Sequence, residues 1–129
     1  MGAAFTDATT ELVIGSCIEV HRALGPGLLE SAYERCVAHE LALRGLRFAR
    51  QVPMPLSYKD VELDCGYRLD FVVDGRVIVE LKAVEELSPI HVAQVITYLR
   101  LSQIDVGLLI NFNVRTLKDG IRRLVRKKP

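Results

Sequence analysis

Two carboxylates and a lysine interrupt a stretch of the chain that is otherwise largely apolar. Residues 67–82 indicate two short strands joined at Asp74-Gly75, and they carry Asp70, Glu80 and Lys82. Because successive side chains of a strand point to opposite faces, Glu80 and Lys82 share one face. Carboxylate oxygens suit a hard cation such as Mg²⁺, and a neighbouring ammonium can orient an attacking water or stabilise developing charge. The set is therefore a candidate for metal-assisted phosphoryl chemistry, with a salt-bridged, partly solvated strand face as the alternative.

The register of this hairpin decides whether Asp70 lies beside Glu80. A two-residue Asp-Gly loop would pair Asp70 with Val79 on the apolar face, where an ionised carboxylate is costly. A three-residue loop or a bulge instead places Asp70 with Glu80 and Lys82. The opposite face is then wholly apolar, formed by Leu69, Phe71, Val73, Val77, Val79 and Leu81. We therefore predict the odd-length loop or the bulge.

Apolar periodicity and turn residues predict the elements around the hairpin. Helical spacing extends over 10–24 and about 28–44, with Gly25-Pro26-Gly27 as the corner between two helices. Short segments rich in β-branched residues then predict an antiparallel meander over 48–58, 61–63, 69–73 and 77–81. Pro53 and Pro55 cannot donate to a ladder, so the first of these strands should lie at an edge or be irregular there.

The last third of the chain predicts a helix, a strand and a helix. Ser88-Pro89 is a good N-cap and first-turn pair for a helix reaching about 102. Residues 106–110 indicate a buried strand, which should join the same sheet in parallel after the crossover. A helix over 116–126 should close the chain with the basic residues Arg122, Arg123, Arg126, Lys127 and Lys128. That basic run is either a solvated helix end or a grip on a nucleic-acid backbone.

We predict one α/β domain over 1–129, a mixed β-sheet flanked by helices. It comprises a helical hairpin over 10–45, a sheet with its crossover helix over 47–110, and the basic C-terminal helix over 116–126. Half of the 129 residues are apolar, enough for a continuous core, and the net charge is only +1. The sequence contains no apolar run long enough to cross a bilayer and no signal-peptide pattern, so we expect a cytoplasmic protein without a membrane partner.

Cysteine and histidine offer weaker candidates for chemistry. Cys17, Cys36 and Cys65 are too few and too far apart for a disulfide framework or a zinc site, and the first two fit apolar helical positions. A cysteine–histidine pairing stays open, although nothing around any cysteine suggests it. The three histidines lack metal-binding spacing and are expected at the surface or near caps: His21, His39 and His91.

Two patterns together resemble a known family. Asp70 followed by Glu80-Leu81-Lys82 resembles the core of PD-(D/E)XK nucleases, and the order of elements is similar to their restriction-endonuclease-like fold. Gly27-Leu-Leu-Glu30-Ser-Ala-Tyr33 is similar to the motif that names the GxxExxY family within that superfamily. The proline that gives the superfamily its name is absent, since Leu69 precedes Asp70.

The resemblance implies a nuclease acting on DNA or RNA with Mg²⁺ or Mn²⁺. It implies metal ligands at Glu30, Asp70, Glu80 and the carbonyl of Leu81, with Lys82 as the catalytic cation and Gln94 in a supporting role. Read without the resemblance, Glu30 is a first-turn acid favoured by the helix dipole. The alternative function is an inactive nucleic-acid-binding or regulatory module that keeps the fold, and a homodimer also stays open.

Overall fold

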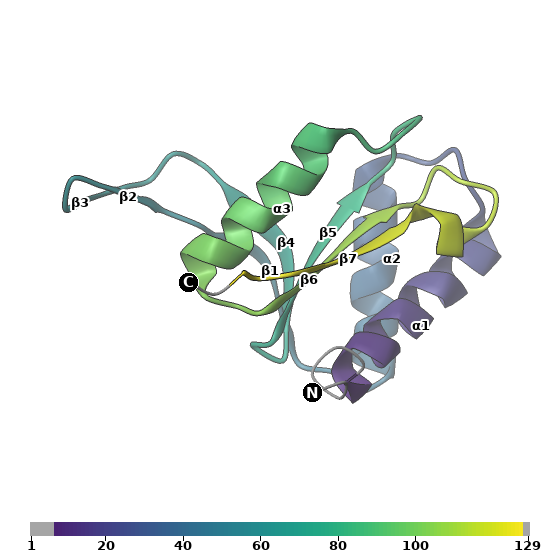
Figure 1. The fold of residues 1–129 in the computed structure, drawn as a ribbon. Helices are drawn as coiled ribbons and strands as arrows, with labels where there is room; N and C mark the ends of the chain where they lie inside the picture. The colour runs from purple at the N-terminus through teal and green to yellow at the C-terminus, as the bar shows by residue number, and fades with distance from the viewer. Residues whose placement is uncertain (1–6, 128–129) are drawn as a thin grey trace.

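A computed structural model describes residues 7–127, in which helices cover both faces of a sheet (Figure 1). The elements in chain order are α1 (Ala8–Leu24), α2 (Glu30–Leu43), β1 (Phe48–Pro53), β2 (Leu56–Tyr58), β3 (Val61–Leu63), β4 (Arg68–Val73), β5 (Val77–Lys82), α3 (Pro89–Ser102), β6 (Val106–Asn111), the short 3₁₀ helix η2 (Leu117–Gly120) and β7 (Ile121–Val125). None of these helices is long and apolar enough to span a membrane.

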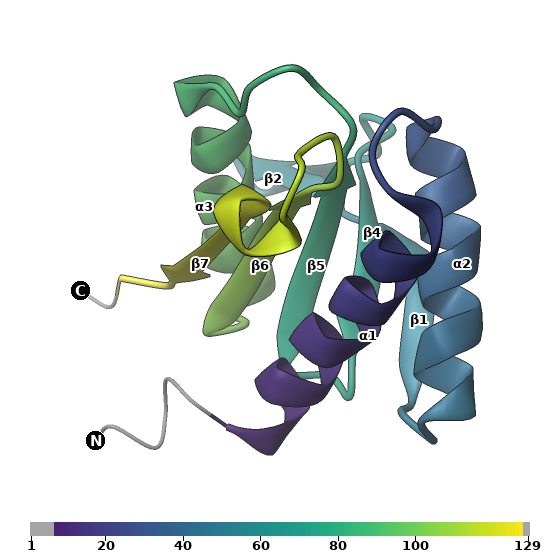
Figure 2. The same ribbon diagram turned by 90° about the vertical axis from the view of Figure 1, so that its right-hand side faces the viewer.

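The main sheet has the strand order β1-β4-β5-β6-β7, and only β5 and β6 are parallel. Helices α1 and α2 cover one face, and α3 covers the other (Figure 2). The larger core cluster joins α1 and α2 to Phe71, Val79 and Leu108, while the smaller one joins α3 to Ile78 and Leu109. The predicted mixed sheet flanked by helices is therefore confirmed.

The corner between α1 and α2 depends on backbone conformations that favour glycine. Gly25 and Gly27 have φ values of 70° and 102°, which residues with a Cβ rarely adopt. The buried Tyr33 fixes the corner from inside, because its hydroxyl donates to the carbonyl of Gly25 (2.5 Å) and accepts from the amide of Leu28 (3.2 Å). Its ring stacks on Phe112, with centroids 4.5 Å apart. This corner places the start of α2 at a defined position.

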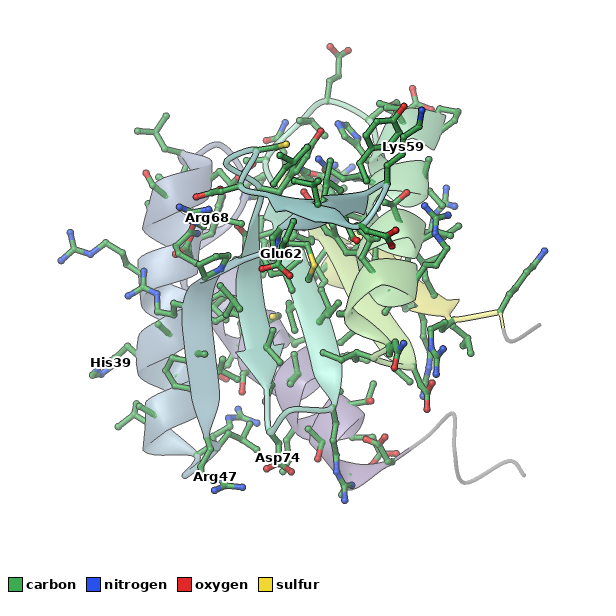
Figure 3. All side chains as sticks on the ribbon, turned by 90° about the vertical axis from the view of Figure 1, so that its left-hand side faces the viewer. His39, Arg47, Lys59, Glu62, Arg68 and Asp74 are labelled. Carbon is green, nitrogen blue, oxygen red and sulfur yellow. The ribbon has the colours of Figure 1, made fainter. Side chains whose placement is uncertain are left out.

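The predicted meander is wrong in one respect. Strands β2 and β3 form a separate two-stranded hairpin, and β1 pairs directly with β4 in the main sheet. The break follows Pro53, the last residue of β1, which lies at the sheet edge as its missing N–H predicts. The hairpin protrudes from the body of the molecule in Figure 1, and Figure 3 shows Lys59 at one end of it.

The predicted basic helix over 116–126 is also wrong. Residues 121–125 form β7, which pairs antiparallel with β6, and only Leu117–Gly120 is helical, as a 3₁₀ turn. The physical reason is the open edge of β6, along which the chain can pair. Gly120 lets the chain approach this edge, because a Cβ at this position would lie only 2.2 Å from the carbonyl oxygen of Asn111. Hydrogen bonds between β7 and the buried strand β6 stabilise this segment more than a short helix with little apolar periodicity would.

Candidate functional site

The loop between β4 and β5 has three residues. Val73 pairs with Val77, which leaves Asp74, Gly75 and Arg76 as the connection. Asp74 and Gly75 both have positive φ, 54° and 64°. Asp74 also lies beside Arg47 (3.3 Å) at this end of the sheet (Figure 3). The predicted odd-length loop is confirmed, and it brings Asp70 opposite Glu80.

Asp70 and Glu80 take over the hydrogen bonds of the ladder at this point. Regular pairing ends at Phe71 and Val79. Beyond it, the amide of Asp70 donates to Glu80 Oε2 (2.6 Å), and the amide of Leu81 donates to Asp70 Oδ2 (2.9 Å). Each carboxylate thus accepts from the backbone of the opposite strand, so the two strands separate around a pair of acids that is held at two fixed points.

The neighbouring strand β1 is irregular at the same level. Its register skips from Arg50↔Phe71 to Val52↔Leu69, and Gln51 between them has a φ of 50°. Leu69 was expected on the face of Phe71. It packs instead in the core cluster under α3. The alternation of side chains between the two faces of the sheet is interrupted at Gln51 in β1 and at Asp70 in β4, so Leu69 lies on the face opposite to Phe71. The predicted dry face is therefore correct from Phe71 to Leu81 and wrong at Leu69.

Gln51 and Glu34 belong to the site and were missed in the sequence. Gln51 Nε2 donates to Glu34 Oε1 (2.9 Å) and to Asp70 Oδ1 (3.3 Å). Arg50 holds the other oxygen of Glu34 at 3.0 Å. The available signal was spacing: Glu34 lies four residues after Glu30 and therefore on the same helix face.

Glu30 is the first residue of α2, at the end that faces the acid pair. It is exposed as a residue, but partial desolvation raises the pKa of its carboxyl, with Asp70 and Glu34 adding repulsion and Lys82 opposing them. Desolvation likewise raises the pKa of Asp70. Lys82 thus acts on both carboxyls at a distance, and it makes no ion pair with any residue in 7–127.

Glu80 is the most perturbed group of the site. Its side chain is buried, with 4% of the residue exposed. Desolvation, followed by repulsion from Asp70, raises its pKa from 4.5 to about 8, whereas the hydrogen bond from the Asp70 amide and the charge of Lys82 work in the other direction. A carboxyl of this kind favours either a proton or a nearby cation.

Gln94 lies on α3, four residues before Tyr98. It lines a groove of about 590 Å³ with Tyr67 and Tyr98, whose ring centroids are 6.3 Å apart. Desolvation, with the nearby charge of Glu80, raises the pKa of Tyr98 to about 12, so its hydroxyl stays a proton donor next to the carboxylates. Gln94 makes no hydrogen bond to them within the described residues, and its supporting role stays a prediction.

The donor set is chemically suited to a divalent cation, although the observed positions are not those of a complete ligand sphere. Residues 7–127 contain no group of three or more His, Cys, Asp or Glu placed to hold a metal ion. Asp70, Glu80 and Glu30 offer hard carboxylate oxygens of the kind that Mg²⁺ prefers. Because the N–H and C=O of a strand residue point to the same side, the carbonyl of Leu81 also faces the gap beside Asp70.

Of the cysteines and histidines, Cys17, His21 and His91 have structural positions, whereas Cys65 and His39 are exposed. Cys17 is buried in the core, and burial raises the pKa of its thiol to about 12, which disfavours the nucleophilic thiolate. His91 Nδ1 accepts from the Ser88 amide (3.0 Å) and completes the cap of α3. His21 is buried, 2.7 Å from the carbonyl of Val114, whereas His39 is exposed (Figure 3).

Comparison with known proteins gives one match. A family model described as the PD-(D/E)XK nuclease superfamily matches residues 7–124. No curated protein and no solved structure matches the chain. The matched region contains every residue of the candidate site.

Proposed function

The chain belongs to the PD-(D/E)XK nuclease superfamily, and on this premise we propose that it is a nuclease of the GxxExxY type that hydrolyses phosphodiester bonds of DNA or RNA with Mg²⁺ or Mn²⁺. The observation that carries the proposal is the interlocked pair of Asp70 and Glu80 beside Lys82. Two acids that replace ladder bonds in a sheet interior, with raised pKa values, destabilise the fold. Such a cost is typical of a functional site.

The metal would be held by Asp70, Glu80 and Glu30, with the carbonyl of Leu81 as a further ligand. A bound divalent cation supplies charge stabilisation at the phosphate and lowers the pKa of an attacking water. Since the three carboxyls do not yet form a ligand cluster, Glu30 or Glu80 has to turn toward the ion when it binds. Glu30 can do so readily because its side chain is exposed.

The chain's own residues position the reactants. Lys82 is left without an ion pair to any described residue, so its ammonium is free to hold the attacking water or the scissile phosphate. Gln51 keeps one oxygen of Asp70 oriented and links it to Glu34. Gln94 and Tyr98, which line the groove along α3, offer an amide and a hydroxyl to the substrate.

The GxxExxY assignment is supported by the part that each motif residue plays at the α1–α2 corner. Gly27 adopts a positive φ, Glu30 starts the helix at the site, and Tyr33 ties the corner together. The motif residues therefore together place the carboxylate of Glu30 near the acid pair.

A cleavage assay tests the proposal. The full chain should degrade labelled single-stranded or duplex DNA or RNA with Mg²⁺ or Mn²⁺ and not with EDTA. Asp70→Ala and Lys82→Ala should each lower the rate at least 100-fold, while the control Lys59→Ala on the β2–β3 hairpin should not. Cleavage that persists in both site variants would reject the assigned site. Metal binding without cleavage of any substrate would favour the inactive module.

A further inference from the structure

We propose that Arg115 and Lys118, in the segment after β6, bind backbone phosphates of the nucleic-acid strand that enters the candidate site. The inference rests on the proposed function, because it names the surface that holds the substrate. It places this contact on a loop and a 3₁₀ turn. The basic residues near the end of the chain, which the sequence suggested for the same role, are not part of this contact.

Both residues line a pocket of about 250 Å³ against α1. Arg22 and the buried His21 contribute from the helix, and the described lining contains no carboxylate. His21 Nε2 lies 2.7 Å from the carbonyl of Val114, so the ring fixes the start of the loop. The pocket therefore combines three cationic side chains with a backbone that is held in place.

The pocket and the acid pair lie at the same end of the sheet, where β5 and β6 finish. The amide of Phe112, directly after β6, donates to the carbonyl of Lys82 (2.8 Å). The Phe112 ring stacks on Tyr33 and lies 6.1 Å from the ring of His21. Figure 2 shows the end of β5, the loop after β6 and the α1–α2 corner along one edge. The pocket and Lys82 therefore lie at the same end of the sheet.

Fewer than half of the lysines and arginines in residues 7–127 are paired with acids, and exposed residues elsewhere, such as Arg35, Lys59 and Arg100, also lie outside the ion pairs. Seven arginines form ion pairs: Arg22, Arg44, Arg47, Arg50, Arg68, Arg76 and Arg126. Arg115 and Lys118 are exposed and belong to none of the pairs formed within residues 7–127. Of the seven, Arg22 is the one that lines the pocket, and its pair with Glu19 is itself exposed. The pocket therefore offers positive charge that no buried acid neutralises.

The basic residues at the C-terminus do not form a comparable surface. Arg126 is paired with Asp105 at 2.9 Å, and guanidinium nitrogens of Arg123 are buried. Lys128 lies outside the described residues. Arg122 and Lys127 are left exposed and outside the ion pairs of the described chain, on and just after an edge strand. They provide a matched control, since each pair contains one arginine and one lysine.

The closing experiment measures binding and cleavage separately. Binding of a fluorescent 20-nucleotide DNA or RNA, single-stranded and duplex, is followed by anisotropy in EDTA over a range of salt concentrations. Two phosphate contacts contribute about 1.4 to 1.8 to the slope of log affinity against log salt. Arg115→Ala/Lys118→Ala should lose about that much slope, whereas Arg122→Ala/Lys127→Ala should keep the wild-type slope. Cleavage with Mg²⁺ is measured on the same three proteins.

The outcomes separate this inference from the proposed function. If the wild type cleaves and the first double variant keeps the wild-type slope, or the control loses as much, the inference fails alone. If no protein cleaves but the slopes differ as expected, the phosphate contact stands and the nuclease activity does not. A wild-type chain that neither binds a probe in EDTA nor cleaves one with Mg²⁺ overturns both.

Discussion

Replacing Glu80 by glutamine should make the metal-free protein more stable at pH 8 and remove much of its dependence on pH. The carboxyl of Glu80 is buried, and desolvation with repulsion from Asp70 raises its pKa from 4.5 to about 8. Glutamine keeps the shape and an oxygen that can accept from the Asp70 amide. It carries no charge that has to be desolvated.

The sign and the size follow from proton linkage. Between pH 4.5 and about 8, the folded state holds a proton on Glu80 that the unfolded state has lost, so the free energy of unfolding falls as pH rises. Below this range both states are protonated, and above it the full cost of the buried charge is present. One pH unit corresponds to about 1.4 kcal/mol, which gives an upper bound of about 5 kcal/mol over the range.

The assay is urea unfolding in EDTA at pH 5 and pH 8, with wild type, Glu80→Gln and the control Glu62→Gln. Glu62 is exposed on the β2–β3 hairpin (Figure 3). Wild type and control should lose stability from pH 5 to pH 8, and Glu80→Gln should lose at least about 1 kcal/mol less. Millimolar Mg²⁺ should raise the stability of the wild type at pH 8 more than that of Glu80→Gln.

The reasoning is refuted if Glu80→Gln is less stable than wild type at pH 8 with an unchanged slope against pH. Glu80 would then be a carboxylate that is well compensated inside the fold. The acid pair would be structural, and the raised pKa values would not mark a functional site.

Three further substitutions test the parts that position the acids. Tyr33→Phe removes the hydroxyl that donates to Gly25 and should lower the free energy of unfolding in urea by about 1 kcal/mol. Its affinity for Mn²⁺ should also fall. An unchanged affinity would show that the α1–α2 corner does not position the metal site. Gly120→Ala forces a Cβ onto the carbonyl of Asn111 and should lower the free energy of unfolding by more than about 2 kcal/mol. A thermal midpoint equal to that of the wild type would contradict the packing of β7 against β6. Gln51→Gly relieves a positive φ, so the free energy of unfolding should stay level or rise by up to about 1 kcal/mol. It also removes the amide that links Glu34 to Asp70, so cleavage should slow. A variant that cleaves at the wild-type rate would show that Gln51 is not part of the site.

The sequence allowed the register of the hairpin to be predicted because a single energetic argument decided it. Only an odd-length loop keeps the carboxylate of Asp70 off the apolar face, and the three-residue loop is what the structure has. Leu69 was misplaced because alternation was extended through Asp70. The turn of the backbone there depends on Gln51 in another strand, which no local pattern reveals.

The conformation of the C-terminal segment could not be predicted from its local residue pattern. The helix predicted over 116–126 is wrong because the open edge of β6, and not the local pattern of residues 121–125, decides their conformation. Glu30 is a different case. Its place at the start of α2 was readable from Gly27 and the apolar periodicity, but its relation to Asp70 came from the family resemblance alone. The charge of Asp70 raises the pKa of the Glu30 carboxyl, which supports that relation.

A structure determined after soaking crystals in Mn²⁺ would show which side chains meet at one ion. We expect a single Mn²⁺ between Asp70 and Glu80, coordinated by oxygens of both, with Glu30 turned toward it and Lys82 nearby without coordinating. An ion bound elsewhere, or an undisturbed pair of Asp70 and Glu80 at saturating Mn²⁺, would contradict this expectation.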